Sequence, residues 1–185
     1  MHNFTPFPVL KTNRLILRNL LESDVDAIFK LRSNPETMKF IPRPLATSKE
    51  EAMNHIQLIQ NKTKENEGIN WAICLQENLE LIGIIGHYRI KPEHFRSEIG
   101  YMLLPEFQSN GIMTEAIKEV VKYGFNEMDL NSIEGIIDPK NSASGRVLEK
   151  NGFIKEAHFL EYEFYDGQFL DTAIYSILKK NCSYL

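Results

Sequence analysis

The segment 98–114, EIGYMLLPEFQSNGIMT, holds residues whose types and spacing suit the binding of a phosphate group. It predicts a buried strand from Ile99 to Leu104, an exit marked by Pro105, a polar loop, and a helix that opens near Met113. The first N–H groups of a helix have no partner within it, and the helix dipole adds partial positive charge there. Gly111 lets a ligand approach the chain closely because it has no Cβ. The segment therefore predicts a phosphate or pyrophosphate site, although a plain strand-to-helix connection would have the same residues.

The elements that must position this loop follow from periodicity and turn residues. Ser23 and Ser48 are suited to cap two N-terminal helices, Gly152 to end a later helix, and Asp166-Gly167 to close a hairpin. The expected strands span 14–20, 71–75, 79–89, 98–104, 132–137, 153–165 and 168–179, and the expected helices span 23–34, 48–64, 113–128 and 141–150. Strands dominate the second half, with two helices inserted, which predicts an α/β or α+β fold with a mixed sheet. No repeat or linker divides residues 1–185, so we expect a single domain.

Composition excludes several classes of protein. The chain has 185 residues and a net charge of -4, which argues against a general nucleic-acid binder because phosphate contacts need a basic face. No apolar run approaches the length of a membrane span, and the N-terminus lacks the apolar core of a signal peptide, so we expect a cytoplasmic protein with no membrane partner. Cys74 and Cys182 offer no metal-ligand spacing, so no metal is expected. A nucleotide-binding P-loop is also excluded, because no Gly-Lys-Ser/Thr follows Gly111.

Three features in order resemble one known family. A Gln-x-x-Gly-x-Met loop at 108–113 precedes a long helix, a strand ends at Asp138-Pro139, and a short Asn-x-x-Ser helix is closed by Asn-Gly-Phe at 151–153. This combination resembles the GNAT superfamily of N-acetyltransferases, and more closely its RimJ/RimL-like branch, which acetylates the N-termini of ribosomal proteins. The resemblance covers nearly the whole chain, from Leu15 to the closing hairpin. One position departs from the family pattern, since Met113 stands where Gly or Ala is usual.

The resemblance implies a central mixed, mostly antiparallel sheet with helices on both faces and one parallel strand pair that splays apart. Acetyl-CoA would lie between the splayed strands, 99–104 and 132–137, as a co-substrate. The pantetheine arm would bind backbone groups of Met102, Leu103 and Leu104. The remaining contacts would come from the loop 108–113, which we call the phosphate loop, from the start of the helix after it, and from the later helix 141–150: Gln108, Ser109, Asn110, Gly111, Ile112, Met113, Thr114, Asn141 and Arg146.

Acetyl transfer to an amine needs a neutral amine, stabilisation of the oxyanion, and a proton for the leaving thiolate. The amine is itself the nucleophile, so we expect direct transfer without a covalent enzyme intermediate. By resemblance, a backbone N–H near Leu103 would stabilise the oxyanion and Ser144 would protonate the thiolate. Two carboxylates compete for the role of general base: Glu98, at the start of the central strand, and Glu163, near the hairpin. Either of them could instead bind a cationic amine, and the sequence leaves this open.

The acceptor is the part of the function that the sequence leaves most open. The leading hypothesis is a protein N-terminal α-amine, as on a ribosomal protein. The alternatives are a small amine (polyamine, aminoglycoside or amino-acid-like) and a non-catalytic acyl-CoA-binding sensor. Exposed hairpin strands over 161–169 are suited to pairing across a dimer, so a monomer and a homodimer both remain open.

Overall fold

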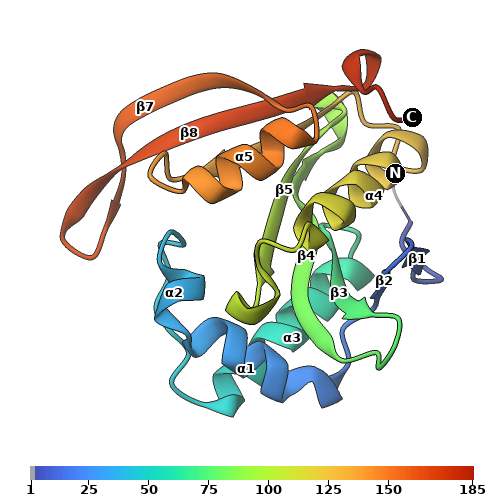
Figure 1. Cartoon of the computed structure of the whole chain (residues 1–185), viewed down its shortest axis with the longest axis vertical. Helices are drawn as coiled ribbons and strands as arrows, with labels where there is room; N and C mark the ends of the chain where they lie inside the picture. The colour runs from blue at the N-terminus through green and yellow to red at the C-terminus, as the bar shows by residue number, and fades with distance from the viewer. Residues whose placement is uncertain (1–2) are drawn as a thin grey trace.

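The structure is a computed structural model that describes residues 3–185, and its core is one eight-stranded sheet (Figure 1). The strand order is β1-β2-β3-β4-β5-β6-β8-β7. All neighbours pair antiparallel except β5 and β6, which are parallel. The strands are β1 Leu10–Lys11, β2 Leu15–Arg18, β3 Ile69–Leu75, β4 Leu81–Lys91, β5 Arg96–Leu103, β6 Ser132–Ile137, β7 Ile154–Tyr165 and β8 Gln168–Leu178. The expected mixed, mostly antiparallel sheet is confirmed.

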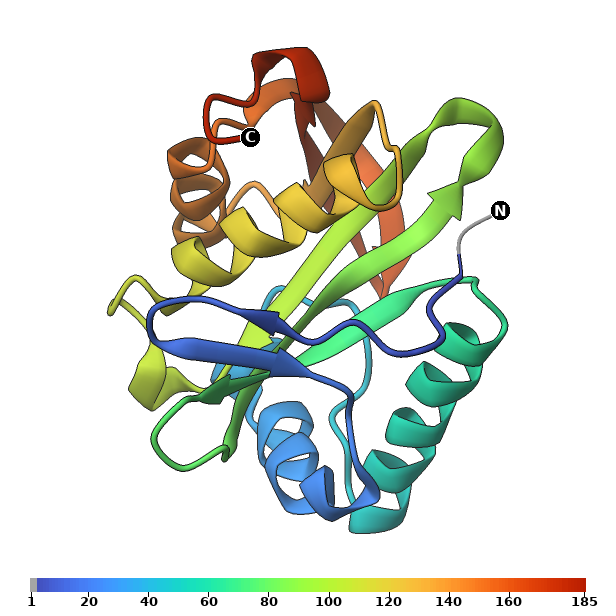
Figure 2. The same ribbon diagram turned by 90° about the vertical axis from the view of Figure 1, so that its right-hand side faces the viewer.

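Helices cover both faces of this sheet, as Figure 2 shows for α4 on one side of the strands and α1 and α3 on the other. The helices are α1 Val25–Ser33, α2 Pro35–Met38, α3 Lys49–Lys64, α4 Ile112–Asn126 and α5 Ser142–Lys150. Short 3-10 helices lie at Glu22–Asp24, Pro92–His94, Pro105–Phe107 and Lys179–Asn181. Within residues 3–185 no helix is long and apolar enough to cross a membrane.

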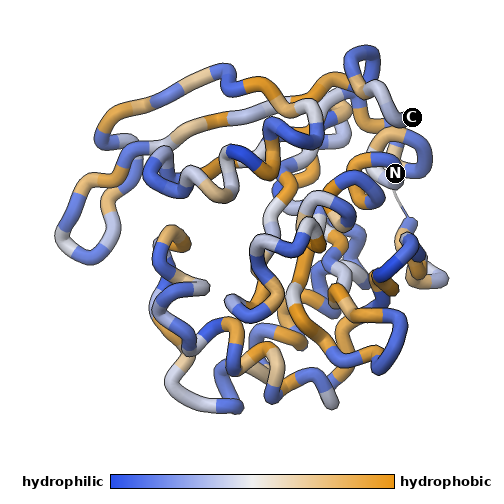
Figure 3. The backbone as a smooth tube through the Cα atoms, in the orientation of Figure 1, coloured by the Kyte–Doolittle hydropathy of each residue, from blue (hydrophilic) through white to orange (hydrophobic). Residues whose placement is uncertain are grey.

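Two apolar clusters hold the layers together. On the α4 side, Trp71 and Phe125 are fully buried in a cluster that includes Ile99 and Leu103 of β5. On the other side, α1 and α3 pack with Leu104 and with strand residues of β3 and β4. Figure 3 shows the resulting pattern, with hydrophobic segments along the central strands and hydrophilic ones around the edges. Because successive side chains of a strand point to opposite faces, β5 sends alternate residues into the two clusters.

The parallel pair β5/β6 separates along its length. Cα partners join Arg96 to Ser132, Ser97 to Ile133 and Glu98 to Glu134, and no partner follows, although β5 continues to Leu103 and β6 to Ile137. We call this divergence the splay. The splay places unpaired strand edges at the centre of the sheet, as the resemblance implied.

One local expectation near the N-terminus was wrong. Ser23 does not cap a helix; it lies inside the 3-10 helix, and the Asp24 carboxylate accepts the Leu21 N–H at 2.8 Å while it binds Arg18. The Asn34-Pro35 pair ends α1 as expected, but it also begins α2, because the Asn34 side chain accepts the N–H of Glu36. The hairpin expectation is confirmed: Asp166 and Gly167 have φ of +47° and +77°, the positive values that a two-residue hairpin turn needs.

Candidate active site

The residues of β5 divide between the two faces of the sheet next to the splay. Ile99 and Leu103 belong to the cluster on the α4 side, so Tyr101 between them faces that side too. Met102 packs with the α1/α3 cluster, so by alternation Glu98 faces the α1/α3 side. A single strand therefore presents different chemistry to the two sides.

On the α4 side, two hydroxyl groups meet. The Oη of Tyr101 lies 2.6 Å from the Oγ of Ser144, in the first turn of α5. The position of Ser144 is fixed by Asn141, whose Oδ1 accepts the Ser144 N–H at 3.1 Å and caps the helix. Burial raises the pKa of Tyr101 to about 12, so the phenol keeps its proton at neutral pH. The pair can therefore hold and pass on a proton.

On the opposite face, a half-buried carboxylate lies among charges of both signs. Glu98 is 16% exposed and accepts a hydrogen bond of 2.7 Å from Arg89 Nη1. Arg89 reaches it because β4 is irregular between Tyr88 and Lys91 and Arg89 has a φ of +43°. Burial raises the pKa of Glu98; Arg89 opposes this, and the charges of Glu134 and Glu163 raise the pKa further. A carboxylate with a raised pKa is a stronger base than an ordinary one.

Glu134 is the partner of Glu98 across the parallel pair, in the last register position before the splay. It binds Arg96 at 3.5 Å. Glu163 lies half-buried on β7. Glu163 thus lies close enough to Glu98 for its charge to raise the pKa of Glu98.

The loop before α4 leaves its backbone donors available. Gly111 is the N-cap with a φ of +74°, a value that favours glycine, and no side chain caps the helix there. Ile112 and Met113 are only 5% and 8% exposed, so their side chains pack in the core. This packing explains why a methionine is accepted where the family usually has Gly or Ala.

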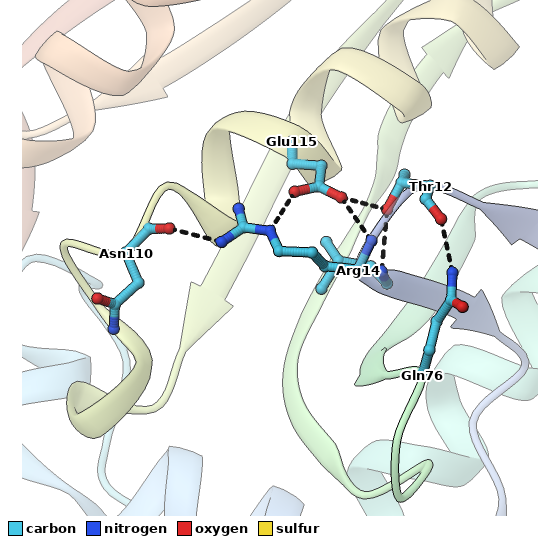
Figure 4. A network of polar contacts seen from close by, with 6 residues as sticks. Thr12, Arg14, Gln76, Asn110 and Glu115 are labelled. Atoms are coloured by element: carbon cyan, nitrogen blue, oxygen red, sulfur yellow. Dashed lines mark hydrogen bonds and ion pairs between the residues drawn. The ribbon is translucent and has the colours of Figure 1, made fainter.

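Arg14, in the turn between β1 and β2, holds this loop, as Figure 4 shows. Its Nη1 donates to the carbonyl oxygen of Asn110 at 3.0 Å, and its Nε binds Glu115 of α4 at 2.7 Å. Glu115 also accepts a hydrogen bond from the Thr12 hydroxyl, and Gln76 Nε2 donates to the carbonyl oxygen of Thr12. Sequence reasoning missed Arg14 because it lies 96 residues before Asn110.

Comparison with known proteins decides the family. The family model for the acetyltransferase (GNAT) domain matches residues 14–154. The chain belongs to the GNAT acetyltransferase family. The protein is therefore an N-acetyltransferase, and GNAT-fold acetyltransferases use acetyl-CoA.

Individual relatives agree with this assignment. The uncharacterized N-acetyltransferase YoaA of Bacillus subtilis is 40% identical over 94% of this chain and 98% of its own. A GNAT-family acetyltransferase structure from Bacillus anthracis superposes with a TM-score of 0.83 at 29% identity, covering 94% of this chain and 99% of that one. The ribosomal L7/L12 α-N-protein acetyltransferase RimL, solved in complex with coenzyme A, shares the fold with a TM-score of 0.84 at 24% identity, covering 92% and 98%. A spermidine N(1)-acetyltransferase of Vibrio cholerae is 24% identical over 90% of this chain and 94% of its own.

Backbone pairing decides which groups of this acetyltransferase face the splay. The Leu104 N–H donates to the Ile82 carbonyl oxygen at 2.9 Å, and the Leu104 carbonyl oxygen accepts from the Phe107 N–H at 3.0 Å, so both backbone groups of Leu104 already have a partner within the chain. Hydrogen bonding alternates along an antiparallel pair, so Met102 also faces β4, while Tyr101 and Leu103 face the splay. The three expected pantetheine contacts, Met102, Leu103 and Leu104, stay predictions, and of these residues Leu103 is the one whose backbone faces the splay.

The other residues expected to bind acetyl-CoA lie in the loop before α4, in the first turn of α4 and on α5. Gln108 Nε2 donates to the Leu103 carbonyl oxygen at 3.1 Å and ties the loop to the end of β5. Ser109 and Asn110 are exposed in the loop, Thr114 is half-buried in the first turn of α4, and Arg146 is exposed on α5. Within residues 3–185 no group of three or more His, Cys, Asp and Glu side chains is placed to hold a metal ion.

Tyr101 and Glu134 were missed by sequence reasoning. Tyr101 could have been predicted, because it lies two residues after Ile99 on a strand already assigned to the splay and therefore shares the face of Ile99. Glu134 had no such signal, because only the register between β5 and β6 brings it beside Glu98.

Proposed function

We propose that this acetyltransferase transfers the acetyl group of acetyl-CoA directly to the N-terminal α-amine of a protein. The observation that carries the proposal is the placement of Glu98 and the Ser144–Tyr101 pair on opposite faces of β5, beside the splay. The donor would approach from the α4 side and the acceptor from the α1/α3 side. The thioester carbonyl would lie between them, where β5 and β6 separate.

The donor side fits acetyl-CoA. The uncapped first turn of α4 offers backbone N–H groups to a pyrophosphate, and Gly111 leaves the approach open. The backbone of Tyr101 and Leu103 is directed toward the splay, where an extended pantetheine can add to the strand edge. Asn141 uses its Oδ1 to cap α5, which leaves its side-chain N–H groups to donate to the pantetheine. Arg146, exposed on the same helix, would meet a phosphate.

The chemical step follows from these positions. Glu98 accepts a proton from the acceptor ammonium, directly or through water. The neutral nitrogen attacks the thioester carbon, and the Leu103 N–H donates to the oxyanion that forms. The carbon–sulfur bond then breaks, and the Ser144–Tyr101 pair supplies a proton to the departing thiolate. The proton that the nitrogen loses as it becomes an amide passes through water to restore this pair, and the proton on Glu98 leaves to solvent with the products. Glu163, on the same side as Glu98 in this scheme, holds the cationic acceptor.

The choice of an α-amine rests on acid–base chemistry. A free α-amine has a pKa near 7.7–8.0 and a lysine amine about 10.4, so at neutral pH the α-amine is roughly a few hundred times more populated in its neutral form. Glu98, a single carboxylate with a raised pKa, is suited to that easier deprotonation. A dicationic polyamine is the competing acceptor, and the carboxylates of Glu98, Glu134 and Glu163 are compatible with it.

The test is mass spectrometry of peptides that begin with Ala or Ser and carry an internal lysine, after incubation with acetyl-CoA. The proposal expects acetyl groups on the N-terminus. Spermidine and an aminoglycoside are assayed in parallel, with Ser144→Ala as the low-activity control. Modification of lysine alone, or turnover of the small amines alone, would overturn the proposal. Absence of thiol release with every amine would indicate a sensor instead.

A further inference from the structure

Three nitrogen-rich side chains gather on the α1/α3 side of the sheet, the side that Glu98 faces. Arg32 belongs to α1, Arg43 to the loop after α2, and His55 to α3. Arg32 Nη1 lies 3.4 Å from His55 Nδ1. The Ala46 N–H donates to the Arg32 carbonyl oxygen at 3.0 Å, which fastens the loop that carries Arg43 to the end of α1. Figure 1 shows α2 and this loop on the side of the molecule toward which the β7–β8 hairpin extends. We call these three residues the cationic cluster.

The charge of the cluster is only partly balanced by the residues around it. Within residues 3–185 neither Arg32 nor Arg43 forms an ion pair. The one carboxylate that acts on Arg32 is Glu51, and both of its oxygens already accept hydrogen bonds from Thr47, at 2.8 and 3.1 Å. Two positive charges thus lie close together, one of them half-buried, without the partner that such groups normally have.

The directions in which the pKa values of Arg32 and His55 are shifted agree with this arrangement. Burial lowers the pKa of Arg32, and the charge of Arg43 lowers it further. Burial and the two arginines lower the pKa of His55 to about 4. His55 is therefore neutral at pH 7, where its Nδ1 can accept a hydrogen bond from Arg32 and orient the guanidinium. A bound anion would relieve the repulsion between the arginines.

Tyr88 connects the cationic cluster to the catalytic carboxylate. It is the partner of Glu98 across β4 and β5, and its ring packs over Gly100, where an added Cβ would lie 2.9 Å from Cε2. Burial and the charge of Glu98 raise the pKa of Tyr88, while Arg43 and Arg32 lower it. The same phenol thus lies within the fields of both Glu98 and the arginines. The acceptor side of the splay presents negative charge and, close by, unpaired positive charge.

We propose that Arg32 and Arg43 bind a carboxylate of the acceptor, so that the preferred acceptor is a peptide with an Asp or Glu directly after its first residue. The α-amine would meet Glu98 while the acidic side chain meets the arginines. Guanidinium groups match the planar carboxylate and bind it through paired hydrogen bonds. The inference rests on the proposed function and narrows it: a dicationic polyamine would place an amine against the cluster. The whole chain has a net charge of -4, but the local field decides at the site.

The experiment compares three peptides that differ only at the second residue, which is Glu, Gln or Lys. We expect kcat/KM for the Glu peptide to exceed that for the Gln peptide by roughly tenfold or more, with the Lys peptide lowest. Arg43→Gln, at an exposed position, should bring the Glu and Gln peptides within about twofold of each other, and Arg32→Lys should preserve part of the preference. Lys49→Gln, which removes an exposed charge paired with Asp26, is the matched control and should leave the ratio unchanged.

The outcomes separate the two proposals. Equal kcat/KM for the Glu and Gln peptides in the unmodified protein would overturn the carboxylate site while leaving N-terminal acetylation intact. An unchanged Glu/Gln ratio in both arginine variants would likewise remove the arginines from the site. Turnover of free amino acids or polyamines without any peptide product would overturn the proposed function itself, and this inference with it. A merely structural role for Arg43 would lower all three rates together and leave their ratio constant.

Discussion

At the scale of single residues, the proposed chemistry depends on side chains that lie on opposite faces of one strand, β5. Ser144 and Tyr101 share a hydrogen bond on the α4 side, and Glu98 lies on the other side with Arg89. Ser144 and Glu98 were predicted from the sequence because motif and strand position mark them. Tyr101 and Arg89 were not, because their roles depend on strand alternation and on the irregularity of β4.

Removing either member of the hydroxyl pair should slow turnover. We expect Ser144→Ala and Tyr101→Phe each to lower kcat by about 10²–10⁴-fold if the pair is the general acid. The double variant should lose little more than either single one, because groups that act as a unit are not additive. Tyr162→Phe, at an exposed tyrosine of β7, is the control. Full additivity of the two losses, measured by steady-state kinetics, would show that the hydroxyls act separately.

The pH dependence of kcat/KM should reflect the protonation of Glu98. A general base must be deprotonated, so activity is lost as pH falls through the pKa of Glu98. Because that pKa is raised, the acidic limb of kcat/KM should lie above 4.5, the ordinary value for a glutamate. Glu98→Gln should remove this limb and lower kcat/KM by roughly 10²–10⁴-fold. If the limb persists in Glu98→Gln and disappears in Glu163→Gln, the base is Glu163.

At the scale of elements, the phosphate loop lies between a strand and a helix that were expected at nearly these positions. The sequence indicated the loop because its glycine, its proline and the apolar stripe of α4 are local signals. The contacts that hold the loop were not foreseeable in this way, since Arg14 reaches it from the turn between β1 and β2, and Gln76 supports that turn by binding the carbonyl oxygen of Thr12. Arg14 is a positioning residue in this account, because it binds the loop and not the ligand.

Removing the contacts that Arg14 makes with the loop should affect only the binding of acetyl-CoA. Arg14→Ala should raise the KM for acetyl-CoA by at most roughly fivefold and leave kcat unchanged, because an exposed ion pair is worth about 0.2–1 kcal/mol. Lys49→Ala breaks a comparable exposed pair far from the loop and serves as control. A fall in kcat at unchanged KM would contradict a positioning role.

At the scale of the whole molecule, the sheet order sets the geometry of the site. The parallel pair at its centre joins segments more than 30 residues apart, and α4 crosses between them. The sequence predicted the strands from their periodicity and two hairpins from their turns, but the parallel pair came only from resemblance to a family, because pairing between distant strands has no local signal. The position of Glu134 and of the cationic cluster depends on that order, which is why neither was foreseen.

Close packing of the central strands makes their glycines sensitive. A Cβ at Gly86 would lie 2.3 Å from the backbone oxygen of Ile69, so the two strands must shift to admit it. We expect Gly86→Ala to cost about 1–3 kcal/mol, a fall of roughly 2–12 °C in Tm by calorimetry. Gly68→Ala, where the nearest atom is at 3.1 Å, should cost less. Equal Tm values for Gly86→Ala and the unmodified protein would contradict the packing argument.

The central claim is that donor and acceptor meet at the splay from opposite faces of β5. It is tested most directly by a crystal structure with a bisubstrate analogue, in which the coenzyme A sulfur is joined through an acetyl bridge to the N-terminal nitrogen of a peptide. We predict that the sulfur lies beside the hydroxyls of Ser144 and Tyr101, that the bridging carbonyl lies between β5 and β6, and that the peptide nitrogen lies on the side of Glu98. An analogue with its sulfur and its peptide nitrogen both on the α4 side, away from Glu98, would contradict it.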